Sequence, residues 1–328
     1  KTILQFNVAG DQIVPFGQSI ALPANFDGTA IDFIQDLFVT TTSAFGGSQI
    51  IFGALSTGEQ VTTTFPGATG PLADAGKPSL VVDATGTVGA LVPARAEDAA
   101  YIAFPGQATA QRVATEIGTF VERVLPFGAF ILAVDANLDD EGDFSPLGPP
   151  RLALHNFTTG EFFDEVQLDG TVNATDALIL DDNVAFLAGG GFTPTFEPAG
   201  DGAIAVINVT TRGIRDILPL GGNGLSIEAG RDGLGYIVRT QGSFETTDVL
   251  TFNFSTQAFE RGPSNPIQPL DADGSNLNCR VVTALATREL LCATFEATAQ
   301  GRLVLLTQDG TFLDEAAIGA GVTDIALR

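Results

Sequence analysis

The sequence contains no tryptophan, no methionine and a single histidine, His155. A lone histidine excludes a zinc site built from several histidines, because such sites need three or four nitrogen or sulfur ligands. No Gly-x-Ser-x-Gly turn is present to hold a serine nucleophile beside it. No apolar run approaches the roughly 18–20 residues that cross a membrane as a helix, and no glycine-rich loop ends in Gly-Lys-Ser/Thr. These absences weigh against catalysis by a classical nucleophile, against nucleotide binding and against membrane insertion.

Basic residues are also scarce. Lys and Arg number 15 against 39 Asp and Glu, which gives a formal charge of -24. Such a chain repels phosphate backbones and anionic lipid heads, so nucleic acid and membrane surfaces are poor partners. The acidity favours either solubility in a salty exterior or the binding of a cation or a basic partner. Because the sequence does not start with methionine, we expect a mature, exported chain whose leader has been removed.

A short turn rich in Ser, Thr and Gly recurs along the whole chain. Its clear copies are residues 56–59, 158–161, 210–213 and 255–258, and looser copies are residues 9–12, 105–108 and 308–311. Each copy lies between two short runs of β-branched or aromatic residues, which are typical of strands. The spacing is about 50 residues, and a unit of several strands repeated at that spacing predicts a blade of a β-propeller.

Seven copies predict an all-β fold, a seven-bladed β-propeller that forms a single domain over residues 1–328. We expect both ends of the chain to build one blade, from about residues 1–22 and 323–328, which closes the ring by N- and C-terminal strands and removes free edges. That closing blade is one strand short. It either has three strands or accepts a strand from a neighbouring molecule.

This repeat resembles that of the secreted seven-bladed propellers of the broad WD40/YVTN-like superfamily. The likeness spans nearly the whole chain and lies in the architecture alone. With no tryptophan, the sequence lacks the Trp-Asp signature of WD40 blades, and it lacks the YVTN tetrapeptide as well. The resemblance therefore implies a propeller and carries over no catalytic residue.

The most specific local motif is acidic. Residues 135–143 place oxygen-bearing side chains at alternate positions, as the loops that bind Ca²⁺ do. The candidate ligands are Asp135, Asn137, Asp139 and Asp143. The match is incomplete, because the glycine stands at the eighth position rather than the sixth and no glutamate stands at the twelfth. The sequence thus leaves a Ca²⁺ site and a solvated acidic loop as alternatives.

The two cysteines, Cys279 and Cys292, lie in two apolar runs joined by a short turn. Adjacent strands of a hairpin would bring them near enough for a cross-strand disulfide, although two buried thiols would also fit. A disulfide implies an oxidising compartment outside the cytoplasm. Four sequons provide candidate glycosylation sites, and three of them coincide with the recurring turn. Their asparagines are Asn156, Asn173, Asn208 and Asn253.

We therefore expect a non-catalytic extracellular or cell-surface scaffold that binds a protein partner or associates with itself, with Ca²⁺ as its bound ion. The main alternative is an enzyme with its site at a propeller pore, either a Ca²⁺-assisted lactonase or a glycosidase that uses two carboxylates. A third interpretation is a filament subunit completed by strand donation.

Overall fold

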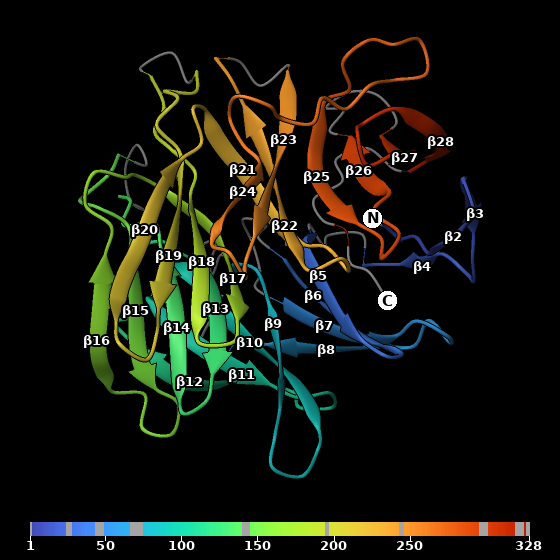
Figure 1. Cartoon of the computed structure of the whole chain (residues 1–328). Helices are drawn as coiled ribbons and strands as arrows, with labels where there is room; N and C mark the ends of the chain where they lie inside the picture. Colours follow the sequence, from blue (N-terminus) through green and yellow to red (C-terminus); the bar gives the residue numbers. More distant parts are fainter. Residues whose placement is uncertain are drawn as a thin grey trace. The chain divides into compact units, whose positions relative to one another are not determined.

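The computed structural model describes residues 2–23, 28–42, 49–65, 75–139, 145–193, 197–242, 246–294, 301–318 and 325. In these residues nearly all regular structure is β-strand (Figure 1), and the one helix is a 3-10 turn at Arg95–Glu97. The all-β prediction is confirmed. Within this part of the chain, no helix has the length and apolar character needed to span a membrane.

The strands form six antiparallel sheets of four, each in chain order. The chain divides into two compact units, one built around residues 17–169 and the other around residues 4–16 and 170–325. The sheets of the first unit are β5 (Gly28–Ile34), β6 (Leu37–Thr42), β7 (Gln49–Ala54) and β8 (Gln60–Thr64); β9 (Ser79–Val82), β10 (Val88–Ala94), β11 (Ala99–Ala103) and β12 (Gln111–Thr115); and β13 (Val121–Phe127), β14 (Phe130–Asp135), β15 (Arg151–Asn156) and β16 (Phe162–Gln167).

The second unit contains the other three sheets of four. They are β17 (Ala174–Leu180), β18 (Asn183–Ala188), β19 (Ala203–Asn208) and β20 (Gly213–Pro219); β21 (Asn223–Ala229), β22 (Leu234–Thr240), β23 (Thr247–Asn253) and β24 (Ala258–Arg261); and β25 (Cys279–Ala284), β26 (Leu290–Thr294), β27 (Arg302–Leu306) and β28 (Phe312–Ala317).

The prediction of seven blades is wrong: the described residues form six sheets of four strands. The first copy of the turn closes only a hairpin, β2 (Phe6–Ala9) with β3 (Gln12–Pro15). The turn marks the link between a third and a fourth strand, so it counts hairpins and not whole sheets. The first 22 residues also form four short strands, because β1 (Thr2–Ile3) pairs separately with β4 (Ile20–Ala21).

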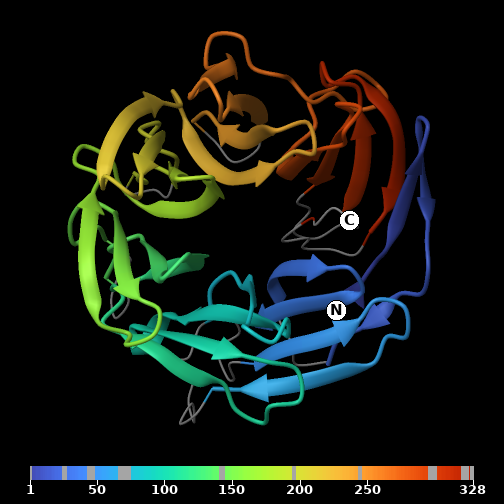
Figure 2. The same ribbon diagram turned by 60° about the horizontal axis from the view of Figure 1, so that its bottom comes forward.

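The hairpin lies beside β28 in the second unit, as Figures 1 and 2 both show. The backbone N–H of Ile13 in β3 donates to the carboxylate of Asp314 in β28 over 2.7 Å. Of the predicted closing segment 323–328, only Ile325 lies within the described residues, and it belongs to no strand. Closure by the two ends of the chain therefore stays a prediction.

The copies of the recurring turn share one backbone feature. Each of its seven copies contains a residue with positive φ: Gly10, Gly58, Gly106, Gly160, Arg212, Gln257 and Gly310, at 60°, 74°, 86°, 73°, 56°, 56° and 89°. This left-handed conformation costs little for glycine and about 1–2 kcal/mol for residues with a Cβ. Side-chain oxygens fix the rest of the turn. The amide oxygen of Asn156, for example, accepts the backbone N–H groups of Thr158 and Thr159 at 2.9 and 3.0 Å.

Burial within each sheet follows strand position. The second and third strands are buried along most of their length, as in β18, β19 and β22. The fourth strands alternate or are largely exposed, as in β20 and β24. This agrees with the expectation that the fourth run of each unit is the most polar. Apolar side chains of neighbouring sheets then pack face to face, for example those of Ile204 and Ile227 in one core cluster of the second unit.

A pair of glycine substitutions separates the backbone requirement of the turn from its packing. Gly106→Ala adds a Cβ that meets no atom within 4 Å, so we expect only the conformational cost, about 1–2 kcal/mol of unfolding free energy. Gly160→Ala places its Cβ 2.4 Å from the carbonyl oxygen of Val113, so we expect a clearly larger loss. Urea unfolding of both variants measures the difference. Equal losses would show that the contact with Val113 does not constrain the turn.

Candidate functional site

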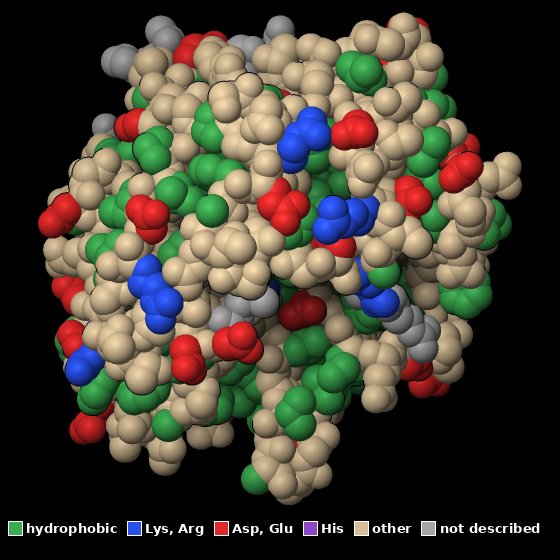
Figure 3. Space-filling model, viewed as in Figure 1, with side chains coloured by type: hydrophobic (Ala, Val, Ile, Leu, Met, Phe, Trp, Pro, Cys, Tyr) green, Lys and Arg blue, Asp and Glu red, His purple; other side chains and the backbone are tan. Residues whose placement is uncertain are grey.

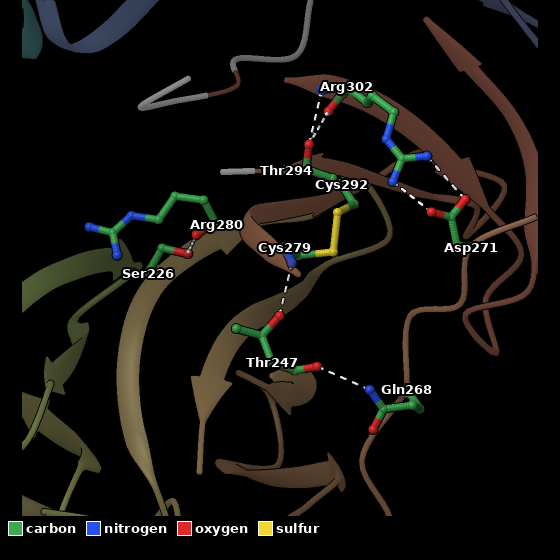
Figure 4. Close-up of a disulfide and its surroundings, with 9 residues drawn as sticks. All are labelled: Ser226, Thr247, Gln268, Asp271, Cys279, Arg280, Cys292, Thr294 and Arg302. Atoms are coloured by element: carbon green, nitrogen blue, oxygen red, sulfur yellow. Dashed lines mark hydrogen bonds and ion pairs between the residues drawn. A yellow bond between two sulfur atoms is a disulfide. The ribbon is translucent and has the colours of Figure 1, made fainter. Parts of the chain in front are cut away.

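The two cysteines form the disulfide that their spacing predicted. Cys279 in β25 and Cys292 in β26 have Cα atoms 5.6 Å apart, and both are fully buried (Figure 4). Cys292 lies opposite Val282, and a bulge after Cys279 in β25 places that residue opposite Thr294. The hydroxyl oxygen of Thr247, in the neighbouring sheet of the same unit, accepts the backbone N–H of Cys279 at 2.9 Å. The bond thus anchors the start of β25 inside a packed core.

The three predicted Ca²⁺ ligands that lie within the described residues, Asp135, Asn137 and Asp139, all have protein partners. Asp135, at the end of β14, is fully buried, and its carboxylate accepts the guanidinium of Arg151 at 2.7 Å. It also accepts the backbone N–H of Asn137 at 2.9 Å, and the amide of Asn137 donates to the carbonyl of Pro149 at 3.0 Å. Asp139 is described, whereas Asp143 lies outside the described residues. Ca²⁺ binding by this loop stays a prediction.

The second unit contains a comparable charge pair at the corresponding end of its strands. Arg239 in β22 and Asp248 in β23 are both buried and are joined by two hydrogen bonds, one of 2.8 Å and one of 2.5 Å. Arg239 also donates to the carbonyl of Leu220. A buried charge is stable only when it is paired in this way, so these groups hold strand ends together. The sequence analysis predicted neither the Asp135–Arg151 pair nor the Arg239–Asp248 pair. The available signal for each was a charged residue within an otherwise apolar run.

The asparagines of the sequons mainly cap turns. Asn156, Asn208 and Asn253 are the last residues of β15, β19 and β23. Each side-chain oxygen accepts a backbone N–H of the turn that follows, from Thr158, Thr211 and Ser255, at 2.7–3.0 Å. Asn208 is only 5% exposed. The fourth, Asn173, has a φ of 59° and donates to the carbonyl of Gly190. Glycosylation of these residues stays a prediction, and capping already explains why three of them are asparagine.

His155 is buried in β15, in the first unit. Its Nδ1 lies 3.4 Å from the carbonyl oxygen of Gly160, and the edge of its ring faces Phe162 with centroids 5.6 Å apart. Within the described residues, its Nε2 has no hydrogen-bond partner. Burial lowers the pKa of His155 below its ordinary value, because the positive imidazolium would lose its hydration. The only histidine of the chain therefore has a structural position.

The second unit also contains a polar hollow of about 320 Å³, where three turns meet. These are the β2–β3, β25–β26 and β27–β28 turns. The lining residues are Asp11, Thr287, Glu289, Thr307, Gln308 and Leu313. Two of these residues carry carboxylates. None of the described residues that line the hollow is a lysine or an arginine. The lining therefore offers mostly oxygen atoms to whatever enters.

Glu289 gives this hollow its electrostatic character. The residue is partly buried, and its Oε2 atom is screened from solvent with no hydrogen-bond partner in the described structure. Elsewhere many acidic side chains are paired, such as Asp271 with Arg302 at 2.6 Å and Glu97 with Arg112 at 3.0 Å. On the face seen in Figure 3, several acidic side chains likewise lie beside a lysine or arginine. An unpaired, desolvated carboxylate oxygen is costly, and a positively charged group in the hollow would satisfy it.

Sequence reasoning did not find this hollow. Asp11 belongs to one copy of the recurring turn and Gln308 belongs to another copy, almost 300 residues away. Their proximity depends on which hairpins lie side by side, and the spacing of the turns does not contain that information. The one available signal was Asp11, the acidic residue in the turn of the incomplete blade.

Comparisons with known proteins show the fold alone. No family model matches the sequence, and no curated protein is similar to it. Among solved structures, a quinonprotein alcohol dehydrogenase-like protein from Bacteroides thetaiotaomicron has a TM-score of 0.57 at 11% identity, over 92% of this chain and 68% of that chain. The WD40 domain of Pan2 from Neurospora crassa has a TM-score of 0.51 at 12% identity, over 90% and 79%. A chain of a nidogen/laminin complex has a TM-score of 0.50 at 10% identity, over 74% and 82%.

These likenesses show that the chain has a β-propeller fold with WD40-like structural neighbours. At 10–12% identity they transfer no activity and no site residue. Together with the six sheets of four strands, they confirm the propeller prediction and correct its number of blades.

The burial of His155 predicts a measurable pH dependence. Because its pKa is lower in the folded state than in the unfolded state, the unfolded chain binds more protons as the pH falls below about 6.5. Unfolding free energy should then decrease between pH 7 and 5, by at most about 1.4 kcal/mol per pH unit. His155→Gln should remove this decrease, which urea unfolding at several pH values would show. The same slope in both proteins would contradict a desolvated histidine.

Proposed function

We propose that this chain is a non-catalytic extracellular β-propeller that binds a protein partner, and that the hollow at Glu289 receives a lysine or arginine side chain of that partner. The observation that carries the proposal is that Glu289 lines the hollow and that its screened Oε2 atom has no hydrogen-bond partner in the described structure. A cation from a partner would replace the lost hydration with a charge-assisted hydrogen bond. The excess of acidic residues would attract such a partner from a distance.

Two further observations support an extracellular interaction protein. The Cys279–Cys292 disulfide is typical of oxidising compartments. One of the similar chains comes from a complex of two proteins, nidogen and laminin. We also propose that residues 1–328 form one domain, closed by strands from its two ends.

The partners and positions of the described carboxylates favour binding over hydrolysis. A carboxylate glycosidase needs two acidic side chains that face the substrate. Two of the described acidic residues that are buried near strand ends, Asp135 and Asp248, are each paired with an arginine and support the fold. Glu289 and Asp11 line the same hollow, which also offers hydroxyl and amide groups. That mixture suits a side-chain cation with several N–H donors.

Two peptides that differ only in charge test the proposal. One contains a single arginine between glycine and serine residues, and the other contains citrulline in its place, which has nearly the same shape and no charge. We expect the arginine peptide to bind more tightly at physiological salt, and Glu289→Gln to reduce its affinity at least tenfold. Because the neutral glutamine side chain would no longer bury an unpaired charge, the melting temperature should stay the same or rise. Titration calorimetry and thermal unfolding measure the two effects.

Glu161→Gln is the matched control, since Glu161 is an exposed acid in a copy of the recurring turn in the first unit. It removes the same charge and should leave arginine-peptide binding unchanged. Equal binding of the two peptides, or an equal effect of the two substitutions, would overturn the proposal. A fall in melting temperature for Glu289→Gln would instead assign Glu289 a structural role.

A further inference from the structure

Among the described strands, β2 is the one in a third-strand position that is not buried. It precedes the recurring turn, as β7, β11, β15, β19, β23 and β27 do in the six complete sheets. Those six strands are buried along most of their length, whereas β2 alternates between partly buried and exposed residues. Its partner β3 has the mostly exposed pattern of other fourth strands. In this hairpin the fourth strand, β3, thus has the exposure that is usual for its position. The third strand, β2, is more exposed than the other third strands.

The backbone of β2 faces β3 on one side only. Ala9 and Gln12 flank the two-residue turn and form a hydrogen-bonded pair, and the N–H of Phe16 donates to the carbonyl of Gln5 at 2.9 Å. Hydrogen bonding alternates along the strand, so Phe6 and Val8 direct their N–H and C=O groups to the other edge. Among the described strands, none pairs with that edge.

From this geometry we infer that the edge of β2 that faces away from β3 accepts an extended segment of a protein partner, which takes the second-strand position of the incomplete blade. Main-chain hydrogen bonds to Phe6 and Val8 would supply affinity, as in other cases of strand addition. An isolated two-stranded hairpin is marginally stable in water, so a third strand would also stabilise β2 and β3. The Ile13–Asp314 hydrogen bond already holds the hairpin against β28, in place for the incoming segment.

The chemistry of the partner segment follows from the two faces of β2. Phe6 and Val8 are partly buried on one face, and Asn7 and Ala9 are exposed on the other. A matching strand therefore alternates apolar residues with polar ones. Its charge is positive, because Asp11 lies in the turn after β2 and the whole chain has a net charge of -24, which repels a second copy of itself. The segment is thus an extended, basic, alternating peptide. This inference deepens the proposed function and depends on it only for the charge of the partner.

Amide hydrogen exchange of the full chain, measured by NMR, tests the inference directly. The probe is a ten-residue peptide in which valine alternates with threonine, flanked by lysines. Without the probe, the amides of Phe6 and Val8 should exchange at least tenfold faster than those of Asn7 and Ala9. With the probe at saturation, Phe6 and Val8 should slow at least tenfold, because their N–H groups become hydrogen-bonded.

Two variants and one control peptide make the result specific. Val8→Pro removes the N–H group on the unpaired edge of β2 without removing a hydrogen bond to β3. It should therefore abolish the effect of the probe on Phe6. Val8→Ile keeps the N–H and should behave like the parent chain. The same peptide flanked by glutamates should bind at least tenfold more weakly.

Several outcomes would overturn the inference. Slow exchange of Phe6 and Val8 in the free monomer would mean that the chain covers this edge itself. Protection that rises with protein concentration, together with a dimer in sedimentation, would mean that the occupant is a second copy. Equal binding of the glutamate-flanked peptide would refute the basic partner. Glu289→Gln should leave protection of Val8 intact at saturating probe, so a failed arginine-peptide test and a failed strand-addition test can be told apart.

Discussion

The structure depends on one local constraint, the left-handed residue in the turn between the third and fourth strand. All seven copies of that turn adopt positive φ, five of them at glycine. Serine, threonine and asparagine oxygens then bind the neighbouring N–H groups, as Asn208 does for Thr211. Each turn reverses the chain between a third and a fourth strand and so forms an outer hairpin. Such regularity allows sheets of very different sequence to repeat along the chain.

The apolar strands between these turns determine where charge is tolerated. Because second and third strands are buried over most of their length, charged groups near them occur at strand ends and in pairs, as in Asp135–Arg151 and Arg239–Asp248. Glu289 departs from this pattern, since its Oε2 atom has no partner within the described residues. In the same unit, β2 departs from the burial pattern of its strand position. Both departures adjoin the β2–β3 hairpin, which makes it the natural place to look for a partner.

Much of the fold could be predicted from sequence because its determinants are local. Turn residues, short apolar runs and the cysteine spacing predicted four-stranded units and the Cys279–Cys292 disulfide, and the structure confirms them. The predicted number of blades was wrong because the turn at Gly10 marks a single hairpin. Such a turn does not show whether two further strands complete the blade. The motif at Asp135 resembled a Ca²⁺ loop, but sequence spacing could not show that Arg151 lies 2.7 Å from that carboxylate on the adjacent strand. The hollow was invisible for the same reason, since Asp11 and Glu289 meet only through tertiary packing.

A crystal structure of the full chain would test the central claim most directly, namely that one recurrent turn closes six complete sheets and one incomplete hairpin. The account predicts positive φ at Arg212 and Gln257. It also predicts that the edge of β2 facing away from β3 pairs with no other strand of the same chain. A second strand of the same chain hydrogen-bonded along Phe6 and Val8 would contradict it, and so would helical or extended backbone at the seven turns.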